Sequence, residues 1–116
     1  METIRSLVFF KNHFNEFFEY QNERVKEKIV SILFLATTPE RIPGKFFEHI
    51  EGTSGLFCIR VEFKGNIYRI FCCFDEGRLI VLLNGFKKKT QKTPLSEIEK
   101  ALKIKREYFS LKMTNK

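Results

Sequence analysis

The sequence predicts an α+β fold in which an N-terminal strand and a helical hairpin pack on a small twisted antiparallel sheet, with a further helix at the C-terminus. Three observations lead to this class. Apolar residues recur at helical spacing between Asn12 and Pro39, alternate along three closely spaced segments between Leu56 and Phe86, and return to helical spacing after Pro94. The 116 residues, 43% of them hydrophobic, suffice for one domain with a substantial core.

The first third of the chain is expected to form one strand and two helices. The run TIRSLVFF predicts a strand at Thr3–Phe10, and Asn12 can cap the helix that follows. Helical spacing continues to Ala36, and Pro39 ends it. The pattern permits one long helix or two, but a helix of about 25 residues is long for a domain of this size, so we expect a break at Gln21–Asn22.

A meander of three antiparallel strands is expected next. The strands are predicted at Leu56–Lys64, Ile67–Phe74 and Arg78–Phe86, after a connecting segment at Lys45–Gly55. The sequences KGN and DEG between the strands are typical of tight turns. The first of them predicts a two-residue hairpin turn at Gly65–Asn66.

This turn would set the register of the first hairpin. With Gly65–Asn66 as the turn, Glu62 lies opposite Arg69 and Arg60 lies opposite Phe71. Arg60 and Arg69 then share a face, where they can bind a phosphate or form a surface ladder in which Glu62 neutralises Arg69. The other face is apolar throughout and is expected to be core; it comprises Phe57, Ile59, Val61, Phe63, Tyr68, Ile70, Cys72 and Phe74.

Positive charge is concentrated near the C-terminus. Residues 1–86 contain 11 basic residues (Lys and Arg) and 11 acidic residues (Asp and Glu). Residues 87–116 contain 10 basic and 3 acidic residues and therefore account for the whole net charge of +7. A polyanion such as nucleic acid is the natural partner of this segment, although an acidic protein or a solvated tail satisfies the same pattern.

The densest charge lies in the stretch GFKKKTQKTP, which contains four lysines and no acidic residue. Lys87, Lys88 and Lys89 directly follow the third predicted strand, so they can meet the two arginines at the edge of the sheet and form a basic basin. The alternative is a solvated loop, and it applies most directly to Lys87 and Lys92.

The final helix is expected to begin at Thr93 and Pro94, which suit the N-cap and the first helical position. An apolar stripe continues along it, and Lys103 and Arg106 occupy its other faces. Tyr108 can stack on a base or pack against the sheet. The last six residues, which begin at position 111, show no pattern and are expected to fray.

Several classes of protein and site are disfavoured. The sequence has no apolar run of about 18 residues for a membrane span and no signal-peptide pattern, so a cytoplasmic location is expected. Cys58, Cys72 and Cys73 lie in apolar runs and are expected to be buried, reduced thiols. His13 and His49 are isolated from each other and from the cysteines, so we expect no metal site and no cofactor.

Four short motifs connect the sequence with a known family. CIR at Cys58–Arg60, YRIF at Tyr68–Phe71, GFKKKTQKTP at Gly85–Pro94 and EIEKA at Glu97–Ala101 follow a two-helix half. In order and spacing they resemble the HigB-like, phage-derived branch of the RelE/ParE toxin superfamily. The resemblance implies a single RelE/ParE-like domain over residues 1–116. It also implies the toxin of a type II toxin–antitoxin pair, with a helix-turn-helix, HigA-like antitoxin as partner.

The resemblance also implies a site. By position, the family's basic active-site residues correspond to Arg60, Arg69, Lys88 and Lys89. Tyr108 lies near the place where some members carry a catalytic tyrosine. The residues expected to contact RNA around this site are Lys87, Lys92, Lys103 and Arg106. Some relatives use a histidine near the C-terminus, which this chain lacks, so the resemblance leaves the general base and acid unidentified.

The activity implied is cleavage of mRNA, usually in the ribosomal A site. The expected reaction needs no metal: a 2′-hydroxyl attacks the adjacent phosphate and gives a 2′,3′-cyclic phosphate. It requires a base, an acid and stabilisation of the phosphorane. Arginine supplies only the stabilisation, whereas lysine can also transfer a proton. Two alternatives remain open, a ParE-like inhibitor of DNA gyrase and a non-enzymatic nucleic-acid-binding module.

Overall fold

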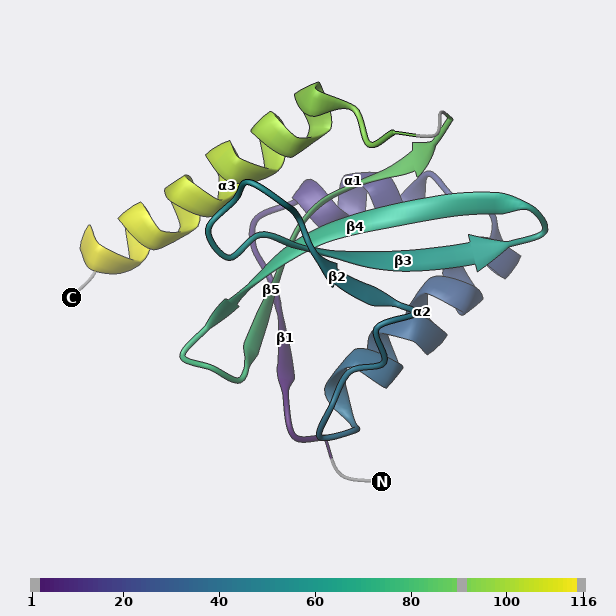
Figure 1. Ribbon diagram of the computed structural model, residues 1–116, viewed down its shortest axis with the longest axis horizontal. Coiled ribbons are helices and arrows are strands. Elements are labelled where there is room, and N and C mark those ends of the chain that lie inside the picture. The colour runs from purple at the N-terminus through teal and green to yellow at the C-terminus, as the bar shows by residue number, and fades with distance from the viewer. Residues whose placement is uncertain (1–2, 90–91, 115–116) are drawn as a thin grey trace.

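The computed structural model describes residues 3–89 and 92–114 and confirms the α+β class. A five-stranded sheet with the order β1-β5-β4-β3-β2 forms the middle layer, with α1 and α2 on one face and α3 on the other (Figure 1). The elements are β1 (Ser6–Phe9), α1 (His13–Glu19), α2 (Glu23–Thr37), β2 (Phe47–His49), β3 (Phe57–Phe63), β4 (Asn66–Asp75), β5 (Leu79–Lys88) and α3 (Leu95–Thr114). No helix among these is long and apolar enough to cross a membrane.

The two predicted helices are confirmed, with the break between them at the expected place. Asn22 precedes α2 in an extended conformation, and its side-chain oxygen accepts a hydrogen bond of 3.0 Å from the backbone N–H of Val25. This satisfies one of the donors left free at a helix start. Asn12 stands at the N-cap position of α1, but its side chain makes no capping hydrogen bond.

The sheet differs from the prediction at both edges. β1 pairs in parallel with β5, from Ser6 opposite Leu79 to Phe9 opposite Leu82, so the sheet is mixed and the expectation of a purely antiparallel sheet is wrong. The segment predicted as a connection contains β2, which pairs antiparallel with β3. A strand's direction depends on its neighbour and a three-residue strand has almost no periodicity, so neither feature is visible in local pattern.

The turn of the β3–β4 hairpin lies one residue earlier than predicted. Lys64 and Gly65 both have positive φ, 48° and 79°, which is what a type I′ turn requires of its two central residues. Phe63 therefore pairs with Asn66, and Gly65–Asn66 is not the turn.

The earlier turn shifts the register of the hairpin by two residues. Arg60 lies directly opposite Arg69, and Glu62 lies opposite Ile67, so the predicted pairs of Glu62 with Arg69 and of Arg60 with Phe71 are wrong. Because side chains alternate with a period of two, a shift of two leaves every residue on its predicted face.

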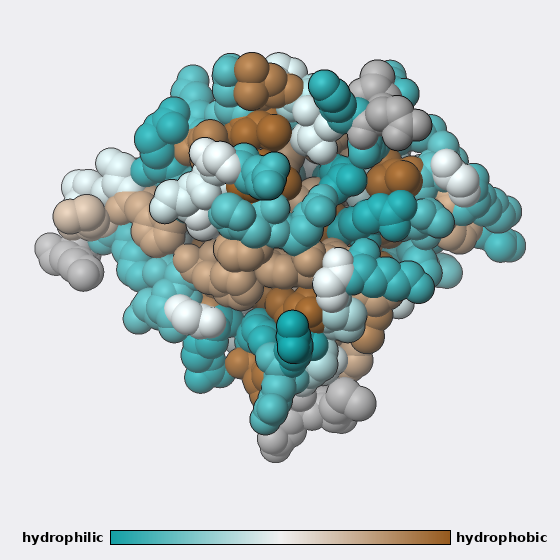
Figure 2. Space-filling view, viewed as in Figure 1, coloured by the Kyte–Doolittle hydropathy of each residue, from teal (hydrophilic) through white to brown (hydrophobic). Residues whose placement is uncertain are grey.

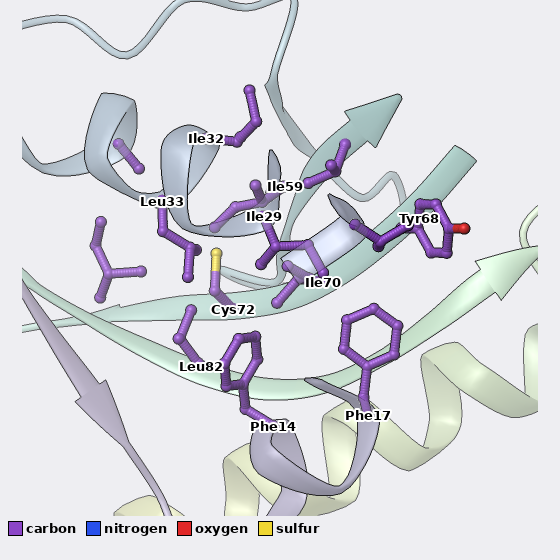
Figure 3. Packing of buried hydrophobic residues seen from close by; sticks show 14 residues of the cluster. Phe14, Phe17, Ile29, Ile32, Leu33, Ile59, Tyr68, Ile70, Cys72 and Leu82 are labelled. Carbon is purple, nitrogen blue, oxygen red and sulfur yellow. The ribbon is translucent and has the colours of Figure 1, made fainter. Parts of the chain in front are cut away.

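The predicted apolar face of the hairpin is confirmed as core. Its residues meet the inward faces of α1 and α2, and the labelled side chains in Figure 3 converge on one another from helices and strands. The packing is tight where α1 crosses β5: an added Cβ on Gly85 would lie 2.5 Å from a ring carbon of Phe17. The fully buried members include Ile29, Ile70, Cys72, Ile80 and Leu82.

A second core, not predicted, lies between α3 and the opposite face of the sheet. It is built from residues that alternate with those of the first core: Leu56, Cys58, Phe71, Cys73, Val81, Leu83, Ala101 and Ile104. The three cysteines are buried and free, as predicted, and burial raises the pKa of the Cys73 thiol to about 11. β4 is thus buried on both faces over Ile70–Cys73.

Polar contacts hold the C-terminal half of α3 on the β4–β5 turn. The Tyr108 hydroxyl donates a hydrogen bond of 2.6 Å to Oδ2 of Asp75, and Lys112 Nζ lies 2.7 Å from Oδ1 of the same carboxylate. The hydrogen bonds from Lys112 and Tyr108 hold the pKa of Asp75 below its usual value. The helix continues to Thr114, so residues 111–114 are helical despite lacking a sequence pattern, while 115 and 116 lie outside the described residues.

Replacement of Gly85 tests the packing of α1 on the sheet. Gly85→Ala is expected to destabilise the protein by about 1–3 kcal/mol, because the new methyl group overlaps the Phe17 ring. Gly44→Ala is the matched control, since nothing lies within 4 Å of a Cβ there. Urea denaturation of both variants checks this expectation, and equal midpoints would contradict it.

Replacement of Asp75 tests the contacts that hold α3. Asp75→Asn is expected to lower the free energy of unfolding by about 1–3 kcal/mol at neutral pH, as for hydrogen bonds to a charged group. The folded-state pKa is depressed, so this stabilisation is present above the unfolded pKa of about 4 and is lost as pH falls through the folded value. Denaturation at pH 7 and pH 2.5 checks the prediction: the difference from wild type should shrink at the lower pH, not persist.

Candidate nucleic-acid interface

Three cations predicted for the site lie on one face of the sheet. Arg60 of β3 is directly opposite Arg69 of β4, and Lys88 of β5 is opposite Ile67 of β4. Alternation along the strands places all three side chains on the face that α3 packs against. Directly opposite Cα atoms are about 4.5–5.5 Å apart and diagonal neighbours about 7–8 Å, so Arg60 and Lys88 each lie beside Arg69. We call Arg60, Arg69 and Lys88 the basic row.

The basic row lies at the end of the sheet that α3 leaves uncovered. In Figure 1 the helix crosses one end of the sheet, whereas the β3–β4 hairpin and the end of β5 extend away from it. Hydrophilic side chains predominate over the hairpin in the same view, beside an apolar patch at the centre (Figure 2). Arg60 and Lys88 are partly exposed and can be reached by an external ligand, whereas Arg69 is almost completely buried.

Arg69 is the most constrained residue of the basic row. It is only 8% exposed, and its Nη1 lies 2.7 Å from Oε1 of Glu48 and 3.6 Å from Sγ of Cys58. Burial lowers the pKa of Arg69, but the hydrogen bonds to Cys58 and Glu48 more than offset this and raise it, so the group stays charged. Its Nε is buried without a hydrogen-bond partner among the described residues.

Glu48 is a site residue that sequence reasoning missed. It lies on β2 opposite Cys58, which places its carboxylate on the same face as the basic row. The side chain is 55% exposed and provides the counter-charge to Arg69. Only the pairing of β2 with β3 brings it there, and no sequence signal predicted that pairing.

Arg60 and Lys88 are more accessible than Arg69. Arg60 forms an ion pair of 2.8 Å with Glu62, two residues along the same strand, and its side chain is 33% exposed. Lys88 is partly exposed and has no acidic partner within ion-pair distance among residues 3–89 and 92–114. The carboxylates of Glu48 and Glu62 thus lie next to the cations rather than neutralising all of them.

The other lysines of the basic stretch lie elsewhere. β5 runs to Lys88, so Lys87 and Lys88 belong to the strand and not to a loop after it. Lys87 and Lys89 line a groove beside α1, on the other side of the strand end from the basic row. Lys92 is exposed between β5 and α3. The structure thus separates Lys88 from Lys89, which were predicted to act together.

The remaining predicted residues also lie outside the basic row. Tyr108 is bonded to Asp75, and Asp75 is six residues from Arg69 along β4, or about 20 Å. Burial and the hydrogen bond to Asp75 raise the pKa of Tyr108 to about 12. Lys103 and Arg106 are exposed on α3. Tyr108 therefore packs in the manner of the structural alternative raised by the sequence.

The described residues offer no ligand set for a metal ion. No group of three or more His, Cys, Asp or Glu side chains is gathered in residues 3–89 and 92–114. His49 lies on β2, where its Nε2 is 2.9 Å from the carbonyl oxygen of Thr53, and its register places it on the face opposite Glu48. His13 lies on α1 against Phe10.

Comparison with known proteins identifies the family. No curated protein matches the chain. A family model described as "Phage derived protein Gp49-like (DUF891)" matches residues 16–106, which include the whole basic row and end just before Tyr108. This match covers most of the 116 residues. The chain therefore belongs to the Gp49-like family of phage-derived proteins, a family associated with the toxins of toxin–antitoxin systems.

Proposed function

We propose that the protein is the toxin of a type II toxin–antitoxin system and cleaves mRNA as an endoribonuclease. One observation carries the proposal: Arg60, Arg69 and Lys88 lie beside one another on one face of the sheet. A cluster of fixed donors of this kind suits a phosphate whose charge increases during reaction. Membership of a toxin-associated family supports the same reading.

The basic row can supply most of what the proposed reaction requires. Attack of the 2′-hydroxyl on the adjacent phosphate concentrates negative charge on the phosphorane, which Arg69 and Arg60 would stabilise as permanent cations. Lys88 would donate a proton to the departing 5′-oxygen. The carboxylates of Glu48 and Glu62 lie on the same face and are candidates to accept the proton of the 2′-hydroxyl.

We further propose a setting for this activity. The substrate would be mRNA on the ribosome, and a helix-turn-helix antitoxin of the HigA type would neutralise the toxin in the cytoplasm. Three cations alone bind RNA weakly at physiological salt, and docking on the ribosome would supply the missing positioning energy. These expectations rest on the family resemblance and on the small size of the basic row.

Substitution of the accessible cations tests the proposed activity. Lys88→Gln, and separately Arg60→Gln, is expected to slow mRNA cleavage about 10²- to 10³-fold, because each removes one donor to the transition state. Mapping of mRNA 5′ ends after brief induction of each variant, together with growth curves, measures the effect. Arg69 is a poor choice for this test, because its removal would leave Glu48 and Cys58 without their partner.

Arg78→Gln is the matched control for charge. Arg78 is exposed at the opposite end of β5, so this variant loses the same charge and should cleave as wild type. Intact mRNA together with DNA damage in the wild type would favour gyrase inhibition. Intact mRNA without toxicity would favour a non-enzymatic binding module. Either result would overturn the proposal.

A second substitution decides the role of Tyr108. Tyr108→Phe keeps the edge-on contacts with Phe10 and Phe109 and removes only the hydroxyl that donates to Asp75. We expect a loss of stability of about 1 kcal/mol and cleavage at the wild-type rate. Thermal denaturation and the same mRNA assay check both parts. Loss of cleavage at unchanged stability would show instead that the Tyr108 hydroxyl takes part in catalysis.

A further inference from the structure

A second basic site lies on the other side of the end of β5. A groove of about 500 Å³ runs between α1, the edge of β5 and the N-terminal half of α3. β1 pairs with β5 only as far as Leu82, so among the described residues no strand covers the edge of β5 that faces this groove. The groove is separate from the basic row, because Lys87 and Lys89, not Lys88, line it.

Charge is distributed unevenly across this groove. Lys87, Lys89 and Lys100 line the side formed by β5 and α3, and Glu16 lines the opposite side on α1. None of the three lysines has an acidic side chain within ion-pair distance in the described part of the chain. An anion in the groove would therefore bind on the β5–α3 side, away from Glu16.

An exposed aromatic ring stands at the α1 side of the groove. Tyr20 follows α1 as its C-cap residue and is 89% exposed, by far the most exposed aromatic residue described. Its ring stacks on no other described ring. A flat apolar surface beside cations is the combination that binds a base and its phosphate in single-stranded nucleic acid.

The floor of the groove has unused hydrogen-bonding capacity. Asn84 is 2% exposed, and its Nδ2 donates to the backbone oxygen of Glu97 at 3.3 Å and to Glu97 Oε1 at 3.1 Å. These bonds orient the amide, and its Oδ1 is left without a partner, as is Nε2 of His13. Both atoms are covered in the unliganded protein, so a ligand would reach them after a side-chain shift. Buried polar atoms rarely stay unpaired without a reason.

We propose that this groove binds one nucleotide of single-stranded RNA, with its phosphate on Lys87, Lys89 and Lys100 and its base on Tyr20. The choice of RNA as ligand rests on the proposed function. Lys88 and Lys87 alternate at the end of β5, and Lys89, which follows the strand, lines the groove with Lys87, so one RNA strand can cross the end of β5 and contact both the basic row and the groove. The groove is then a subsite for a nucleotide next to the one that is cleaved.

The inference is tested by binding of an RNA that cannot be cut. A fluorescein-labelled 2′-O-methyl hexaribonucleotide lacks the attacking hydroxyl, so anisotropy with the full chain reports binding alone. Tyr20→Ala is expected to weaken binding about fivefold or more through lost stacking, whereas Tyr20→Phe should bind as wild type. Phe34→Ala, another exposed aromatic on α2, is the matched control and should have no effect.

Salt dependence tests the phosphate contact independently. Lys100→Gln is expected to reduce the slope of log K against log salt by about 0.7, the contribution of one phosphate in single-stranded nucleic acid. Arg78→Gln, at the far end of β5, should leave the slope unchanged. Tyr20 and Lys100 are both exposed, so their replacement should not impair folding, and circular dichroism verifies this.

The outcomes separate the groove from the proposed activity. If the wild type cuts mRNA but Tyr20→Ala and Lys100→Gln bind RNA normally, the proposed nucleotide subsite is wrong and the proposed endoribonuclease activity is unaffected. If the wild type never cuts mRNA but binds the hexanucleotide through Tyr20, the proposed nucleotide subsite is supported and the proposed endoribonuclease activity is wrong. If the two variants instead lose only the binding of an acidic partner protein, the groove is a protein interface and the inference is wrong.

Discussion

Burial of β4 on both faces is the constraint on which the rest of the structure depends. Ile70 and Cys72 face α1 and α2, while Phe71 and Cys73 face α3, and all four are almost completely buried. A strand covered on both sides needs a helical layer on each, and α3 crosses only one end of its face of the sheet (Figure 1). Next to Phe71 on the α3 face of β4, the apolar series is interrupted by the buried Arg69.

This arrangement explains why a charged residue can sit so deep. The Arg69 guanidinium lies at the border of the second core, and the half-exposed Glu48 is its one ion-pair partner among the described residues. Such a pair adds little stability, since desolvation of the ions offsets their attraction, and an apolar residue would pack at least as well. Packing therefore does not explain an arginine at this position, whereas the proposed phosphate contact would use a fixed, permanently charged donor there.

Much of the fold could be predicted because it follows from periodicity. The first core corresponds to the alternating apolar residues of β3 and β4, and the break between α1 and α2 was expected from the length of the helical pattern. The position of the β3–β4 turn could not be predicted from the sequence, because either Lys64–Gly65 or Gly65–Asn66 can form the two central residues with positive φ. The structure uses Lys64–Gly65. β2 and the direction of β1 depend on partners distant in the chain, which local pattern does not encode.

The candidate site was predictable in part for the same reason. Arg60 and Arg69 were predicted on the correct face because side chains alternate with a period of two, so a register error of two residues does not move any side chain to the other face. Glu48, Tyr20 and Lys100 come from three other elements, so only the assembled fold brings them near the basic residues.

The three consecutive lysines show how the residue at which β5 ends determines which surfaces of the protein carry positive charge. If a loop began after Phe86, the backbone would not fix the directions of these side chains, and the three lysines could gather in one basic patch. Because β5 continues to Lys88, backbone geometry directs Lys88 to the face of the arginines and Lys87 to the opposite side, toward α1. The end of one strand thereby supplies cations to two separate surfaces about one sheet thickness apart, a spacing that a single-stranded polyanion can bridge and a compact anion cannot.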